Sequence, residues 1–287
     1  WHWARFGGSY KDHLAGYQQR EFFSDEQWKT YQISRLKDIL AECAYHVPYY
    51  RDHWDSDVKS AASQGVLSAL PLLEKDQIRR LSDHLKRVDQ KKYIKFYFQT
   101  SGTSGTPITS IFTLSELRNS MALREARSAN WAGVSFKQPR ATFSGRIVEP
   151  NPQRETHIYR YNAKEKQVYF SAFHLRPQTA KRYVAALRKH NVKWMTGYAV
   201  SFYLLAKYVL EQNLDTPEIS AVITTSEKLT SEMRSVIMEA FHTNVFEEYS
   251  TVENALFASE CEQGRLHVSP DVGIVEILRP DGSTCEP

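Results

Sequence analysis

The sequence is poor in cysteine and has no long hydrophobic run. Its 287 residues include three cysteines, Cys43, Cys261 and Cys285. This odd, sparse set argues against a disulfide framework and for a reducing cytosol. No apolar stretch approaches the length of a transmembrane helix, and the first residues do not resemble a secretory signal. These absences favour a cytoplasmic globular protein over a secreted or membrane-spanning one.

A strong charge of one sign is also lacking. The chain has 37 Lys and Arg against 33 Asp and Glu, for a net charge of +4, with only short basic clusters such as residues 86–92. Nothing in this distribution indicates nucleic-acid binding. Aromatic residues are plentiful at 13%, which suits a large sheet and a flat organic ligand. The length allows one large hydrophobic core or two modest ones.

Strand and helix patterns alternate along the middle of the chain. Strands are predicted at residues 140–144, 167–173, 193–198, 219–224 and 245–249. Between them, helices are predicted from residue 177, at 201–212 and at 230–241. This alternation predicts the α/β class, with a mostly parallel sheet flanked by helices.

The two ends of the chain have different patterns. Residues 1–60 are predicted to be helical, because Ser24 and Gln27 form a capping box and apolar residues from Leu36 to Cys43 recur on one face. Pro48 is expected to stop that helix. A second capping box, Thr113 with Glu116, opens a helix to about residue 131. Two C-terminal strands are predicted at residues 266–268 and 274–278.

A small, polar loop follows the strand predicted at residues 94–98. Residues 100–107 read TSGTSGTP, with two glycines, five hydroxyls and no bulky side chain. Glycine allows close backbone approach, so such a loop suits a polyanion such as phosphate, held on N–H groups and hydroxyls. It is not a Walker A loop, because no Lys-Ser or Lys-Thr follows the required glycine spacing.

Three predicted strand ends carry small polar residues: 100–106, 224–227 and 249–253. Open α/β sheets bind ligands beyond the carboxyl ends of their strands. The three segments are therefore expected to converge at one edge of the sheet and to form one ligand site.

These segments resemble a known family. Residues 100–107 resemble the phosphate loop of the adenylate-forming superfamily, and residues 249–253 (YSTVE) resemble its Tyr-Gly-x-Thr-Glu segment. The chain is most similar to the branch of phenylacetate–CoA ligases and the CapK-like proteins of polysaccharide gene clusters. Four further matches lie at residues 46–51, 197–204, 224–229 and 258–270. All six occur in family order, from near residue 5 to the end of the chain.

The resemblance implies a reaction and a domain plan. ATP and a carboxylic acid would form an acyl-adenylate, and the acyl group would then pass to CoA, or in a CapK-like enzyme to a sugar or another amine. Residues 1–90 would be the helical N-terminal part of the large domain, 91–260 the core that binds nucleotide and acid, and 261–287 the start of a β subdomain. The partners would be ATP, Mg²⁺ and a small acid, and a homodimer is left open.

The resemblance also implies roles for individual residues. Glu253 would bind Mg²⁺, and Thr251 would lie near the α-phosphate, so both would be catalytic. His174, Gly197, Tyr198 and Ala199 would form the acid pocket. ATP would be bound by Ser101, Gly102, Thr103, Ser104, Gly105, Thr106, Ser226, Glu227, Tyr249, Ser250 and Thr251.

Plainer interpretations exist for several of these residues. Ser226 would cap the helix that begins near residue 230, and Glu227 would complement its dipole. Tyr249 would belong to the core, Glu253 would be a solvated surface acid, and His174 would cap the helix near Pro177. For Ser226, Glu227, Tyr249 and Glu253, the six matches taken together favour the functional interpretations.

The sequence departs from the family pattern in four respects. A lysine common in the phosphate loop is replaced by Thr106 or Ile108, the glycine after Tyr249 is Ser250, and the following threonine is Val252. The family's small C-terminal lid domain also has no counterpart, so the chain is expected to be either a fragment or a natural short form. These departures support an alternative, a degenerate domain that binds a nucleotide or partner without turnover.

A metal site is a further candidate. Cys261 and His267 lie six residues apart around Gly264, and relatives in the phenylacetate-ligase branch carry a structural metal near such a segment. Zinc needs about four nitrogen or sulfur ligands. A buried thiol and a hydrogen-bonded imidazole are therefore the favoured interpretation, with a structural Zn²⁺ as the alternative.

Overall fold

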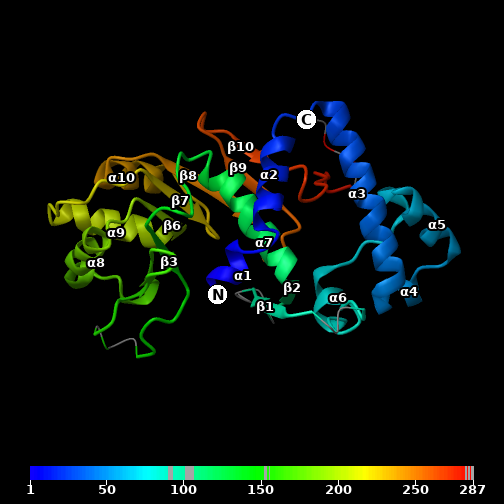
Figure 1. Cartoon of the computed structure of the whole chain (residues 1–287), viewed down its shortest axis with the longest axis horizontal. Coiled ribbons are helices and arrows are strands. Elements are labelled where there is room, and N and C mark those ends of the chain that lie inside the picture. The colour runs from blue at the N-terminus through cyan, green and yellow to red at the C-terminus, as the bar shows by residue number, and fades with distance from the viewer. Residues whose placement is uncertain are drawn as a thin grey trace. The chain divides into compact units, whose positions relative to one another are not determined.

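The computed structural model describes residues 1–89, 93–100, 107–151, 154, 156–281, 283 and 285 (Figure 1). The chain forms two compact units. The first consists of residues 1–6, 121–251 and 256–269, and the second of 7–120, 252–255 and 270–287. The division at residues 90 and 260 expected from the sequence stays a prediction.

An eight-stranded sheet forms the centre of the first unit, in the order β10-β9-β8-β7-β6-β3-β5-β4. Strands β5, β3, β6, β7 and β8 run parallel, whereas β4, β9 and β10 pair antiparallel at the two sides. This arrangement confirms the α/β class. The strands are β3 (Arg140–Ser144), β4 (Tyr159–Asn162), β5 (Gln167–Ser171), β6 (Trp194–Tyr198), β7 (Ala221–Thr225), β8 (Val245–Ser250), β9 (Phe257–Glu260) and β10 (Leu266–Val268).

Three helices cover one face of this sheet: α8 (Pro177–Lys189), α9 (Ala199–Glu211) and α10 (Ser231–Phe241) (Figure 1). Their apolar stripes meet inward-facing strand residues such as Phe143, Met195 and Val222. Pro177 stands at the start of α8, where its missing N–H costs nothing. The side chain of Thr230 caps α10.

The opposite face packs on shorter segments. Trp194, Ala221 and Ile223 alternate with the residues of the first face and form a second buried cluster. The π-helical segment Arg124–Ala129 contributes Ala129 to it. The short helix α1 (His2–Phe6) lies near this cluster, because Phe6 packs against Phe136, which itself packs on it.

A buried ion pair lies on β3. The guanidinium of Arg140 donates to the Glu165 carboxylate at 2.7 Å, and neither side chain is exposed. Burial lowers the pKa of Arg140 to about 10, and the carboxylate of Glu165 opposes this shift. Arg5 of α1 donates to the same carboxylate at 2.7 Å.

Replacing Glu165 with glutamine is expected to reduce the free energy of unfolding by about 3 kcal/mol, because Arg140 would remain buried without its counter-charge. Urea denaturation followed by circular dichroism measures this change. The matched control is Glu211→Gln, which removes an exposed partner of Lys207 and should cost less than about 1 kcal/mol. A similar small loss at Glu165 would contradict the role assigned to the pair.

The second unit is mainly helical. Leu40, Trp54 and Ala62 form a small core between three of its helices. The capping boxes Ser24–Gln27 and Thr113–Glu116 are both present, as predicted. The elements are α2 (Tyr10–Arg20), α3 (Asp25–His46), α4 (Pro48–His53), α5 (Ser56–Gln64), η1 (Leu67–Ala69), α6 (Lys75–Arg80), β1 (Lys95–Gln99), β2 (Thr109–Thr113) and the start of α7 (Leu114–Leu123).

The strand predicted at residues 94–98 is confirmed, but its place in the parallel sheet and the strand predicted at residues 274–278 are wrong. The strand at residues 94–98 is β1, which pairs antiparallel with β2 in a separate two-stranded sheet and does not join the parallel sheet. Residues 274–278 form no strand; only Leu278 makes an isolated bridge. All five of these residues are exposed, so apolar composition alone did not provide a neighbouring strand.

Strands β2, β4 and β9 were not predicted, and helix boundaries moved slightly. Pro48 does end α3, but it also begins α4 at the position where proline is tolerated. On α3, Leu40 is buried as expected, whereas Ile39 is half exposed. No helix among the described residues has the length and apolar character needed to cross a membrane.

Candidate functional site

The carboxyl ends of β7 and β8 lie side by side. These strands are parallel neighbours, with Thr225 in register with Glu248. Residues 224–227 and 249–251 therefore meet at one edge of the sheet, as predicted for two of the three strand ends. Strand β1, which precedes the third segment, is not part of this sheet, and the convergence of that segment with the other two stays a prediction. Residues 101–106, to which ATP contacts were assigned, lie outside the described residues.

An arginine and a buried carboxylate lie at this edge. Nη1 of Arg124 is 3.1 Å from Oε1 of Glu248, whose side chain is only 4% exposed. Nη2 of Arg124 donates to the hydroxyl of Ser250 at 3.3 Å. The hydroxyl of Thr225 donates to Glu248 at 3.4 Å. The sequence did not reveal Arg124 and Glu248, because one falls in a predicted helix and the other inside a predicted strand.

Ser226 and Glu227 form the turn after β7. Ser226 has a left-handed φ of 69°, which re-aims the chain directly after the strand. Oε2 of Glu227 accepts the backbone N–H of Val200 at 2.9 Å, in the first turn of α9. The interpretation that Ser226 and Glu227 serve the helix near residue 230 is wrong, because Thr230 caps α10 and Glu227 caps α9.

Gly197, Tyr198 and Ala199 connect β6 to α9. Gly197 has a φ of 145°, and a Cβ there would lie 1.9 Å from the carbonyl oxygen of Phe143 on β3, so only glycine fits. A Cβ added to Gly145 would lie 3.0 Å from the hydroxyl of Tyr198, so this hydroxyl lies near the carboxyl end of β3. Ala199 is fully buried.

His174 is buried and follows β5. Its Nε2 lies 3.2 Å from the carbonyl oxygen of Asn151 and its Nδ1 2.7 Å from the hydroxyl of Ser171. A carbonyl only accepts, so Nε2 carries a proton and, in the neutral ring, Ser171 donates to Nδ1. The imidazole does not cap α8, because the hydroxyl of Thr179 accepts the N–H of Arg176 there. The acid-pocket role of His174 stays a prediction.

Tyr249 and Glu253 are both exposed. The tyrosine side chain is 57% exposed, so the interpretation of Tyr249 as core is wrong. Thr251 is half-buried, and its N–H donates to the carbonyl of Leu256 at 3.3 Å. Glu253 lies in the four-residue turn 252–255, which belongs to the second unit.

The zinc candidates lie in the β9–β10 hairpin of the first unit. The N–H of Cys261 donates to the carbonyl of Arg265, and His267 is exposed and packs edge-on against Trp131, with ring centroids 5.7 Å apart. Neither belongs to the group with metal-ligating geometry found among the described residues. All three cysteines are free thiols.

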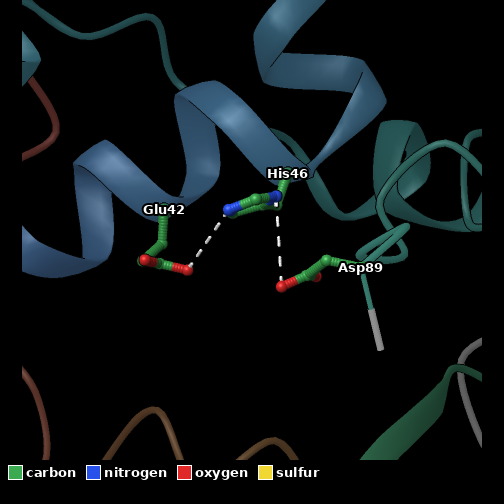
Figure 2. A group of neighbouring side chains, drawn as sticks. All are labelled: Glu42, His46 and Asp89. Carbon is green, nitrogen blue, oxygen red and sulfur yellow. Dashed lines mark ion pairs between the residues drawn. The ribbon is translucent and has the colours of Figure 1, made fainter. Parts of the chain in front are cut away.

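That group is Glu42, His46 and Asp89, in the second unit (Figure 2). His46 lies between the carboxylates, with Nε2 3.9 Å from Glu42 and Nδ1 3.9 Å from Asp89. The two ring nitrogens face different carboxylates. Nη2 of Arg87 lies 2.5 Å from Glu42 and 2.6 Å from Asp89, and the bond from Arg87 lowers the pKa of Asp89. The group is therefore an ion-pair network.

Known proteins resemble this chain in sequence and in fold. No family model matches the chain. The chain is 27% identical over 223 residues to protein CapK of Staphylococcus aureus. The matched region covers 77% of this chain and 49% of CapK. The structure of 2-hydroxyisobutyryl-CoA ligase with 2-HIB-AMP and CoA, in the thioesterification state, superposes with a TM-score of 0.60 and 16% identity, covering 91% of this chain and 57% of the ligase.

A second structure of that ligase, in the postadenylation state, gives a TM-score of 0.53 with 15% identity, covering 84% of this chain and 52% of the ligase. The chain thus spans about half the length of the relatives it matches. The resemblance drawn from the sequence is confirmed: the chain is related to CapK and has the fold of the adenylate-forming superfamily.

Proposed function

We propose that the chain is the nucleotide- and acid-binding part of an enzyme that converts a carboxylic acid and ATP into an acyl-adenylate and pyrophosphate. The observation that carries the proposal is the adjacency of residues 224–227 and 249–251 at the carboxyl edge of β7 and β8. In open α/β sheets this edge is where ligands bind. The ligase with the same fold was crystallised with an acyl-adenylate.

The exposed side chain of Tyr249 suits stacking on the adenine, and Ser226 and Glu227 stand on the neighbouring strand end. The backbone N–H groups and hydroxyls of residues 101–106 would hold the β and γ phosphates. Thr251 would lie near the α-phosphate. Displacement at phosphorus depends mainly on positioning and charge neutralisation.

A magnesium ion suits the residues present. The carboxylate of Glu253 is exposed and makes no hydrogen bond or ion pair with any residue that the structure describes. Mg²⁺ prefers oxygen ligands and is commonly bound by one or two carboxylates together with substrate phosphates. When bound, the ion would neutralise charge on the phosphates. Glu253 would hold it.

The acyl acceptor in the proposed second step is CoA, as in 2-hydroxyisobutyryl-CoA ligase. The alternative acceptor is a sugar or another amine, which is what the CapK-like resemblance implies. We place the reaction in the cytoplasm, because the free cysteines suit a reducing compartment.

ATP–pyrophosphate exchange by the full-length gene product tests this function. We expect exchange that depends on one class of carboxylic acid and on Mg²⁺, followed by product formation with either CoA or an amine. Calorimetry of Mg²⁺·ATP binding runs in parallel. Binding without exchange would instead support the degenerate domain suggested by Ser250 and Val252, and absence of binding would contradict both.

A further inference from the structure

We propose that Arg124 is a positioning residue for the nucleotide-binding end of β8 and that it acts as a pair with Ser250. The inference rests on the proposed function and deepens it. It names a residue outside the family-like segments and explains how the chain uses a serine where the family has glycine.

The pair belongs to a closed hydrogen-bonded network. Arg124 contacts Oε1 of Glu248 at 3.1 Å and the hydroxyl of Ser250 at 3.3 Å. The hydroxyl of Ser250 in turn donates to the same oxygen of Glu248 at 3.5 Å. The hydroxyl of Thr225 reaches this oxygen at 3.4 Å. The network therefore joins the ends of β7 and β8, on either side of Tyr249.

The burial of Glu248 determines what Arg124 does in this network. The carboxylate of Glu248 is 4% exposed and needs a cationic partner, which Arg124 provides. Arg124 and Glu248 together carry no net charge, so the guanidinium would not serve chiefly to attract phosphate. Its geometric effect is to hold the hydroxyl of Ser250, and a hydrogen bond that involves a charged group is stronger than a neutral one.

The backbone that carries Arg124 is anchored. Arg124 opens the π-helical segment, where the N–H of Asn130 donates to the carbonyl of Glu125, five residues earlier. The carboxylate of Glu125 accepts bonds from Ser135 at 2.5 Å and from the N–H of Phe136 at 2.8 Å. Short π-helical segments frequently occur at functional sites, because the wider turn re-aims the side chains.

Ser250 stands between the residues assigned to the adenine and the α-phosphate, Tyr249 and Thr251. A serine there without a partner would only narrow the space over the nucleotide. Bonded to Arg124 and Glu248, its hydroxyl is directed into the network and fixes the strand end. Loss of either member of the pair should therefore weaken nucleotide use and leave use of the acid unchanged.

The test compares Arg124→Lys, Ser250→Ala and the double variant in the full-length protein by ATP–pyrophosphate exchange. Each single change is expected to lower kcat/KM for ATP about tenfold, the effect of losing one charge-assisted hydrogen bond, with the KM for the acid unchanged. The double variant should be no worse than either single one, because both remove the same interaction. Ser250→Ala keeps a Cβ at this position. Its effect therefore reports the loss of the hydroxyl and not the added backbone freedom that a glycine would bring.

Arg234 provides a matched control. It pairs with Glu260 at 2.8 Å, its side chain is 31% exposed like that of Arg124, and it contacts the carbonyl of Val245 at the opposite end of β8. Arg234→Lys should leave kcat/KM for ATP unchanged. Melting temperatures of all variants show whether the fold is retained.

Equal kinetic effects of Arg124→Lys and Arg234→Lys would overturn the proposal, as would additive effects in the double variant or wild-type kinetics of Ser250→Ala. The proposed function would stand in these cases, because the wild-type protein would still catalyse exchange. No acid-dependent exchange by the wild-type protein would overturn both the proposed function and this inference.

Discussion

Replacing Glu253 with alanine is expected to lower acid-dependent ATP–pyrophosphate exchange about a thousandfold. The exposed carboxylate is the residue assigned to Mg²⁺, and without it the charge on the triphosphate would be poorly neutralised as the α-phosphate is attacked. The measurement is kcat of the full-length protein over a range of Mg²⁺ concentrations. Excess Mg²⁺ should restore part of the rate, because the phosphates still bind the ion.

The control for this variant is Glu262→Ala. Glu262 is also an exposed acid in a turn, the β9–β10 hairpin, and it has no assigned role. Its loss should leave both kcat and the Mg²⁺ dependence unchanged. If Glu253→Ala behaved in the same way, the magnesium role would be wrong and the interpretation as a solvated surface acid would hold.

Replacing Gly197 with alanine is expected to reduce the free energy of unfolding by about 5 kcal/mol, close to the whole stability of many domains. The added Cβ would lie 1.9 Å from the carbonyl oxygen of Phe143, and also within 2.8 Å of the carbonyl carbon and the nitrogen of that residue. Gly197 and Phe143 are register partners on β6 and β3. Relief would therefore require separating two central strands. Urea denaturation, or the soluble yield if the variant does not fold, reports the effect.

Gly133→Ala measures the cost of backbone strain in the absence of a steric clash. Gly133 has a φ of 72°, but a Cβ there would meet nothing within 4 Å. Alanine should cost only about 1 kcal/mol, the usual penalty for a left-handed conformation. Equal losses at both positions would show that φ, and not the close approach of the strands, dominates at Gly197.

Local features of the sequence predicted much of the first unit. Pro177 at the start of α8, with Tyr183 and Leu187 on its buried face, matched the structure. The alternation of strands and helices predicted the parallel order through β6, β7 and β8. These features depend on the periodicity and end chemistry of single elements, which neighbouring residues determine.

The sequence did not predict which distant segments pair as strands. An apolar run at residues 94–98 was recognised as a strand, but not as one that would pair with residues 109–113. Nothing in its periodicity distinguishes a strand of the central sheet from one in a separate hairpin, because cross-strand partners decide that choice.

The sequence by itself determined the fold class, the cap of α3, and the two polar segments that meet beyond β7 and β8. Only the tertiary structure decided that Glu227 caps α9 and that Arg124 holds Ser250, a residue 126 positions away. The physical reason is that propensity and capping act over a few neighbouring residues. A buried carboxylate such as Glu248 instead takes whichever cation the folded chain brings within reach.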